Sequence, residues 1–137
     1  MVVPTGRARV LVIEDEPVVA ETLAIVFSNA GYETRKANSA ESALALLELE
    51  KWIPQFAIID VHLPGMNGID LAIMLKAQYP DLPVSLFSGR AETAELIEEA
   101  NKQGHSFDVL AKPVHPTLLL QMAYSFLGGA GPNPLLM

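Results

Sequence analysis

Short apolar runs alternate five times with longer segments in which apolar residues recur at helical spacing. The short runs are typical of β-strands and occupy residues 10–13, 32–37, 57–59, 84–87 and 107–111. The longer segments predict helices over residues 18–30, 39–51, 69–77, 91–103 and 117–127. Chains that alternate in this way form a parallel sheet with right-handed crossovers and helices on both faces. The sequence therefore predicts a doubly wound α/β domain with five strands and five helices.

Residue types at the ends of the helical segments support these boundaries. Pro17 suits the first turn of a helix, and Gly31 is a natural stop for the same helix. Asn38 is followed three residues later by Glu41, which predicts a capping box at the start of the second helix.

Size and composition set further limits. The 137 residues fit one domain, which we place at residues 8–127 between a leader, 1–7, and a flexible tail, 128–137. Half of the residues are hydrophobic, so we do not expect a disordered chain. The longest apolar runs are far shorter than a membrane span, and we expect no membrane partner.

The net charge and the absence of cysteine limit the classes of binding partner and the cellular compartment that we expect. The formal net charge is −7, and no basic run of the kind that binds nucleic acid is present. We therefore expect cations or basic protein surfaces as partners, and no nucleic acid. The chain has no cysteine, which removes disulfides and thiol chemistry. This composition fits a reducing compartment, and we expect a cytoplasmic location.

Polar side chains follow four of the five expected strands. An acidic run, 14–16, follows the first strand, and Asp60 ends the third. Ser88 follows the fourth strand and Lys112 follows the fifth. Ligands of such sheets bind beyond the carboxyl ends of the strands. We therefore expect these residues to share one site.

This set of side chains suits the chemistry of a phosphoryl group. Carboxylates from two strand ends repel one another, and a hard divalent cation such as Mg²⁺ relieves that repulsion through oxygen ligands. Asp60 would supply a nucleophilic oxygen, whose attack on a phosphoryl group gives an aspartyl phosphate. The ammonium of Lys112, the hydroxyl of Ser88 and a backbone N–H near Gly89 would balance the charge on the transferred group.

Each of these residues has a simpler explanation when taken alone. An acid after an apolar strand is often a solvated loop residue, a serine there is often a helix cap, and a lysine before proline usually lies on the surface. An acidic run also favours the N-terminus of a helix. The combination favours a functional site, because all of these residues fall at the carboxyl ends of expected strands.

The chain resembles the receiver domain of two-component response regulators over about 9–127. The resemblance rests on four motifs: Glu14-Asp15-Glu16-Pro17, Asp60 followed by Leu63-Pro64-Gly65-Met66-Asn67-Gly68, Ser88-Gly89, and Lys112-Pro113. It implies a flavodoxin-like fold with strand order 2-1-3-4-5. It also implies a signalling switch rather than an enzyme, because receivers catalyse only their own phosphoryl transfer and dephosphorylation.

The same resemblance implies roles for individual residues. Asp60 would take a phosphoryl group from the phosphohistidine of a sensor histidine kinase or of a phosphotransfer protein. Asp15 and Asp60 would coordinate Mg²⁺, with the backbone carbonyl of His62 as a further ligand and Glu14 positioning a metal-bound water. Two side chains would contact the phosphoryl group, namely Ser88 and Lys112. The peptide bond that follows the lysine would be cis.

Three positions bear on switching and on the lifetime of the phosphate. Three residues before the lysine, where the family usually has Tyr or Phe, this chain has Val109. His62 and Arg90 lie two residues beyond Asp60 and Ser88, where side chains flank the path of the attacking water. Two bulky side chains at these positions, both able to carry positive charge, would slow hydrolysis of the phosphate.

The sequence does not determine which molecule receives the signal from this domain. No stretch after the fifth helix is long enough for an output domain, so we expect a stand-alone receiver or a piece of a longer protein. Its output would be a protein contact through the fourth helix, fifth strand and fifth helix. Apolar residues cover about half of the fifth helix, which suits a downstream protein or a second copy of the chain. Packing by tail residues 135–137 is the alternative.

Two other function classes compete with the phosphorylated switch. A pseudo-receiver would bind partners without being phosphorylated. A Mg²⁺-dependent phosphohydrolase would turn over small molecules through an aspartyl phosphate. Such hydrolases usually place a second acid two residues after the nucleophile as a general acid, and this chain has His62 there.

Overall fold

The computed structural model describes residues 7–89 and 93–127. Within these ranges lie five helices and a parallel sheet of five strands in the order β2-β1-β3-β4-β5. The predicted doubly wound α/β fold and its strand order are thus confirmed. The tail, 128–137, and all of the leader but Arg7 fall outside the described residues. No helix in the described ranges combines the length and the apolar character that a membrane span needs.

Strands and helices alternate along the whole described chain. The strands are β1 (Arg9–Ile13), β2 (Glu33–Ala37), β3 (Phe56–Asp60), β4 (Val84–Ser88) and β5 (Asp108–Ala111). The helices are α1 (Pro17–Asn29), α2 (Ala40–Glu50), α3 (Gly68–Gln78), α4 (Thr93–Lys102) and α5 (Pro116–Leu127). Every strand begins and ends within one residue of its expected bounds.

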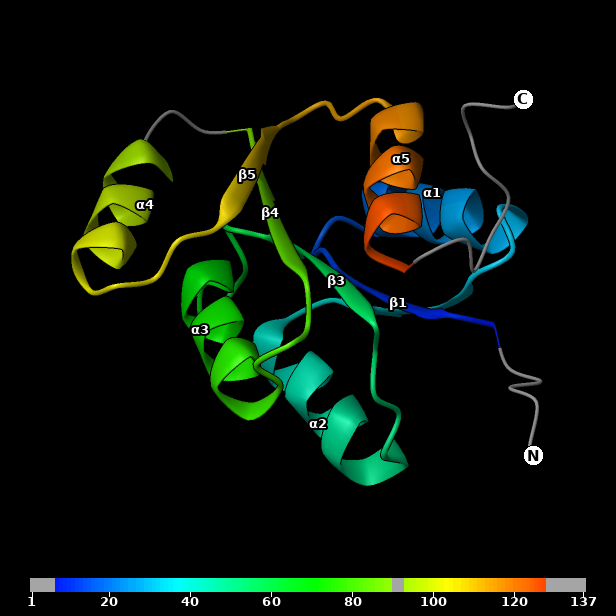
Figure 1. Ribbon diagram of the computed structural model, residues 1–137, viewed down its shortest axis with the longest axis horizontal. Helices are drawn as coiled ribbons and strands as arrows, with labels where there is room; N and C mark the ends of the chain where they lie inside the picture. Colours follow the sequence, from blue (N-terminus) through cyan, green and yellow to red (C-terminus); the bar gives the residue numbers. More distant parts are fainter. Residues whose placement is uncertain (1–6, 90–92, 128–137) are drawn as a thin grey trace.

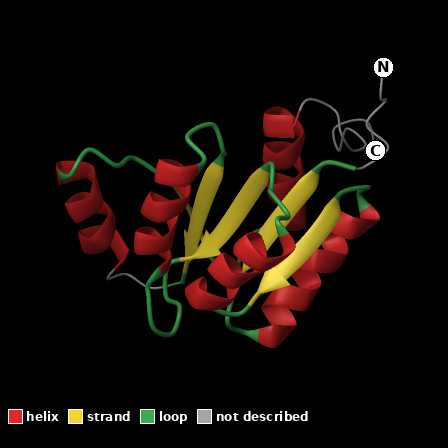
Figure 2. Cartoon of the chain, turned by 90° about the horizontal axis from the view of Figure 1, so that it is seen from below, coloured by secondary structure: helices red, strands yellow, loops and turns green. Residues whose placement is uncertain are grey.

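The sheet separates two layers of helices. Helices α1 and α5 lie side by side on one face, and α2 and α3 cover the other (Figure 1; Figure 2 shows the strands between the helices). Successive side chains of a strand point to opposite faces, so Val10 and Val12 pack toward α1 and α5. Leu11 and Ile13 pack toward α2 and α3, and Ala100 of α4 joins that same core. The central strands are therefore buried on both faces, as their continuous apolar runs predict.

Local signals explain several of the helix ends. Pro17 opens α1. Gly31 follows the helix with a φ of 101°, and the N–H of Tyr32 then donates to the carbonyl of Phe27. At the other face of the sheet Asn67 caps α3, because its side chain accepts a hydrogen bond from a backbone N–H of the first turn.

The start of α2 differs from the sequence prediction. The prediction of a capping box formed by Asn38 and Glu41 is wrong. Ser39 is the N-cap, and its hydroxyl accepts a 3.0 Å hydrogen bond from the N–H of Ser42. The N-cap has extended backbone immediately before the first helical residue, and Ser39 occupies that place. The carboxylate of Glu41 instead accepts a hydrogen bond from the N–H of Met66, 25 residues further along the chain.

Candidate functional site

The pairing of the strands brings the predicted site residues to one edge of the sheet. β1 and β3 pair in parallel with a register that puts Glu14 and Asp60 at the same level. On the other side of β3, Lys112 follows β5, and its backbone N–H donates to the carbonyl of Ser88 at 3.0 Å. The structure therefore brings together residues that are up to 98 positions apart in the sequence.

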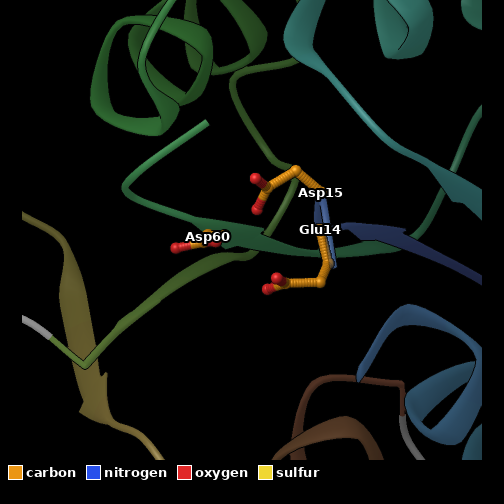
Figure 3. Close-up of side chains that lie close together, drawn as sticks. All are labelled: Glu14, Asp15 and Asp60. Atoms are coloured by element: carbon orange, nitrogen blue, oxygen red, sulfur yellow. The ribbon is translucent and has the colours of Figure 1, made fainter. Parts of the chain in front are cut away.

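Three carboxylates converge at this edge. Glu14 and Asp60 are buried, with 1% and 3% of their surface exposed, whereas Asp15 is exposed. One oxygen from each carboxylate lies within 4.8 Å of the others, and Figure 3 shows the three side chains pointing to the same side. Hard divalent cations take oxygen ligands and keep bound waters when a site stays partly open. The cluster therefore fits Mg²⁺ in both its donor atoms and its access to solvent.

Lys112 joins the two buried acids. Its Nζ donates to Oε2 of Glu14 at 3.0 Å and to Oδ2 of Asp60 at 3.3 Å. The same nitrogen lies 4.8 Å from the centre of the Phe87 ring, which places the cation over an aromatic face. The peptide bond between Lys112 and Pro113 is cis, as the resemblance implies. The ammonium thus lies within hydrogen-bond reach of the predicted phosphoacceptor.

The pKa values of Glu14 and Lys112 are both raised in the folded protein, for different reasons. Burial raises the pKa of Glu14 to about 7, against the lowering effect of its hydrogen bonds from Lys112 and from the N–H of Glu16. Burial alone would lower the pKa of Lys112, but its hydrogen bond to Glu14 and the charge of Asp60 outweigh that effect and raise it. Lys112 therefore stays charged at neutral pH, whereas Glu14 keeps its proton to a higher pH than an ordinary glutamate.

A polar hollow of about 260 Å³ lies in front of Asp60. Its lining consists of Asp15, Glu16, Asp60, His62, Gly89 and Lys112. One oxygen of Asp60, Oδ1, accepts a hydrogen bond of 3.1 Å from the N–H of His62. A larger hollow of about 550 Å³ lies at the amino ends of β3 and β4, but among the described residues that line it Asp81 alone carries a carboxylate. We assign the site to the smaller hollow, because the acids and the lysine converge there.

The remaining predicted residues divide into three groups. Ser88 is buried at the end of β4, and Gly89 lies beside Lys112 on the rim of the hollow. Arg90 lies outside the described residues. Val109 pairs with Leu86 on the edge strand and is 39% exposed. Its side chain is therefore partly open to solvent on the last strand of the sheet.

Two residues that sequence reasoning did not assign to the site contact Asp60 or the loop that follows it. Gly68 packs against the backbone of Asp60, and its N–H donates to the carbonyl of Val61 at 2.9 Å. Glu41 reaches the loop between Asp60 and α3 from another helix. The spacing of residues in the sequence predicts neither contact, because both contacts depend on the path of the loop between Asp60 and α3. Gly68 did form part of the motif that carried the resemblance.

Residues 10–124 match the family model of the response regulator receiver domain. The chain belongs to the response regulator receiver family. The receiver is 32% identical over 117 residues to the DNA-binding response regulator MtrA of Mycolicibacterium smegmatis, covering 85% of this chain and 49% of that protein. It is 35% identical over 115 residues to the response regulator protein FleR of Pseudomonas aeruginosa, covering 84% of this chain and 24% of that protein. The receiver therefore spans half or less of the length of these relatives.

Solved structures give the same result. The receiver domain of NtrX from Brucella abortus superposes with a TM-score of 0.73 at 32% identity, over 87% of this chain and 98% of that one. A CheY-like receiver domain protein from Methanospirillum hungatei JF-1 gives a TM-score of 0.78 over 91% of this chain and 97% of that one. At 23% identity the second likeness supports the fold alone. Receivers of this family act in two-component signalling, and the function of this chain belongs to that class.

Proposed function

We propose that this receiver accepts a phosphoryl group on Asp60, with bound Mg²⁺, and passes the signal on through protein contacts. The observation that carries the proposal is the setting of the Asp60 carboxylate. It lies 3.3 Å from the ammonium of Lys112, and one of its oxygens lies within 4.8 Å of oxygens of Glu14 and Asp15. A nucleophilic oxygen, a cation for the transferred group and a cluster of metal-type ligands thus meet at one hollow.

The transfer step uses the side chains of this chain as follows. An oxygen of Asp60 attacks phosphorus, a new O–P bond forms, and the bond from phosphorus to the donor breaks. The electron pair of that bond leaves with the donor, which is an imidazole nitrogen when the donor is a phosphohistidine. Lys112 already donates to Asp60, so its ammonium can follow the charge onto the phosphoryl oxygens without a large movement.

The other residues have supporting roles in this proposal. Asp15, Asp60 and the backbone carbonyl of His62 would hold Mg²⁺, with Glu14 acting through a bound water. Bound Mg²⁺ supplies charge neutralisation for the acids and for the phosphoryl oxygens. Two further donors would contact the phosphoryl group, the hydroxyl of Ser88 and the N–H of Gly89.

The proposed partners are proteins. A sensor histidine kinase or a phosphotransfer protein would supply the phosphoryl group, in the cytoplasm. The output surface would combine α4, β5 and α5, where Val109, Leu118 and Phe126 are 39%, 43% and 42% exposed. The expectation of no nucleic-acid partner finds no support in the comparisons, because MtrA is named a DNA-binding response regulator and this chain spans 49% of it. The proposal therefore covers protein contacts alone.

Intact-mass measurement tests this proposal against its competitors. The protein is incubated with Mg²⁺ and acetyl phosphate, with a parallel sample that contains a chelator. The proposal predicts a gain of one phosphoryl group that requires Mg²⁺ and is absent in Asp60→Asn. No gain with any donor would favour a pseudo-receiver. Sustained turnover of phosphomonoesters would favour a phosphohydrolase, whereas a receiver only dephosphorylates itself.

A further inference from the structure

The loop of residues 61–67 joins Asp60 to α3 and borders the proposed site. Its first part is tied to the site, because the N–H of His62 donates to Oδ1 of Asp60. Its last residue, Asn67, caps α3. Within the described part of the chain, residues 63–66 have one hydrogen bond, from the N–H of Met66 to Oε2 of Glu41 at 3.1 Å. A carboxylate of α2 therefore makes the polar contact that holds the middle of this loop.

The backbone at Gly65 is shaped around that carboxylate. Gly65 has a φ of 71°, and a Cβ at this position would lie 3.0 Å from Oε2 and 3.2 Å from Oε1 of Glu41. Both observations favour glycine, which accepts the left-handed conformation and leaves room for the carboxylate against the loop. Two consecutive loop residues therefore accommodate Glu41. Gly65 leaves space for the carboxylate, and the N–H of Met66 donates a hydrogen bond to it.

The position of Glu41 at the start of a helix favours an ionised acceptor. It lies in the first turn of α2, where the helix dipole favours a negative charge. The hydroxyl of Ser39 caps the same turn and fixes where the helix begins. Hydrogen bonds to an ionised acceptor are stronger than neutral ones. The carboxylate therefore links the loop to a helix that packs on the sheet.

We propose that Glu41 is a positioning residue for phosphoryl transfer at Asp60. This inference rests on the proposed function. The loop carries the His62 carbonyl and borders the hollow in which the phosphoryl donor would bind. Without the hydrogen bond from Met66, the loop populates other conformations, and the transfer rate falls with the fraction of molecules that keep the productive one.

Three variants separate this role from a general effect of charge. Glu41→Ala removes the acceptor, and Glu41→Gln keeps an acceptor oxygen while removing the charge. Glu48→Ala removes the same charge from an exposed position of the same helix, and no hydrogen bond of Glu48 is found among the described residues. The readouts are the rate of Mg²⁺-dependent phosphorylation by acetyl phosphate, the Mg²⁺ affinity, and the hydrogen exchange of the Met66 amide without any donor.

The proposal expects Glu41→Ala to accelerate exchange at Met66 about tenfold and to slow phosphorylation about three- to tenfold. Mg²⁺ affinity falls in the same variant, because the His62 carbonyl is less often in place. Glu41→Gln falls between the natural protein and Glu41→Ala, because its neutral oxygen still accepts the hydrogen bond but accepts it more weakly. Glu48→Ala leaves all three readouts unchanged. Equal loss in Glu41→Ala and Glu48→Ala would overturn the proposal, and so would unchanged exchange at Met66. If the natural protein gains no phosphoryl group, the proposed function fails separately, because the exchange measurement needs no donor.

Discussion

Gly68 lies so close to Asp60 that a Cβ at position 68 would stand 2.0 Å from the Asp60 carbonyl oxygen. The same Cβ would lie 2.9 Å from the Cγ2 atom of Ile59. The first residue of α3 therefore sets the position of the backbone that carries the proposed phosphoacceptor. Backbone atoms of a central strand cannot move aside cheaply, because both of their neighbouring strands hold them.

Gly68→Ala should damage both the fold and the site. We expect a loss of about 3 kcal/mol or more in the free energy of unfolding, because the new methyl group overlaps the backbone of β3. Urea unfolding measures that loss. Gly104→Ala is the matched control, because Gly104 has a φ of 89° and no atom of the described chain beyond its two neighbours lies within 4 Å of the Cβ position. It should lose only the cost of its backbone conformation, about 1 kcal/mol, so equal losses in the two variants would contradict the account.

Glu14 should make the metal-free protein less stable as the pH rises. Its pKa is raised by burial from 4.5 to about 7, so the folded protein keeps a proton that the unfolded chain has already released. The free energy of unfolding should therefore fall between pH 4.5 and about 7, by roughly 3 kcal/mol for this group. Urea unfolding in a chelator at several pH values measures the slope. Glu14→Gln should remove most of it, and an unchanged slope would show that Glu14 is not the cause.

Lys112 should be needed for transfer and should not be replaceable by arginine. Lys112→Ala leaves the charge of Asp60 without its ammonium, and we expect phosphorylation by acetyl phosphate to slow about tenfold or more. Lys112→Arg should not restore the rate, because a broad planar guanidinium cannot take the place of the single ammonium nitrogen that donates to both Glu14 and Asp60. Mg²⁺ binding should persist in both variants, since the three acids remain. Full activity of Lys112→Arg would contradict the assigned geometry.

His62 should prolong the life of the phosphate. Its side chain lines the same hollow as Asp60, where a water must enter to hydrolyse an aspartyl phosphate. In His62→Asn a smaller side chain opens that path, and we expect phosphate loss to become about three- to tenfold faster. The decay of the phosphorylated species, followed by intact mass after the donor is removed, gives the lifetime. A lifetime that does not change would remove His62 from this role.

The fold could be predicted from the sequence because its signals are local. Apolar runs such as residues 84–87 mark strands, and Pro17 and Gly31 mark the two ends of a helix. The gathering of Asp60 and Lys112 was also predictable, since parallel strands present their carboxyl ends at one edge. Only the general topology of the sheet is needed for that inference.

The details that the sequence did not predict depend on the local path of the backbone or on contacts between distant segments. Asn38 and Ser39 are both good cap residues, and only the backbone path decides between them. The contact of Glu41 with the loop at Met66 joins residues 25 positions apart, through a turn whose shape no spacing rule describes. The raised pKa of Glu14 follows from burial, which a strand-end position alone does not reveal.

The most direct test is to locate the phosphoryl group itself. The protein is phosphorylated with acetyl phosphate and Mg²⁺, then reduced with borohydride, which converts an aspartyl phosphate to homoserine. Peptide mass spectrometry then identifies the converted residue. The account predicts conversion at Asp60 and at no other residue, with none in the sample that contains a chelator. Conversion at Asp15 instead, or no conversion after a confirmed gain of a phosphoryl group, would contradict it.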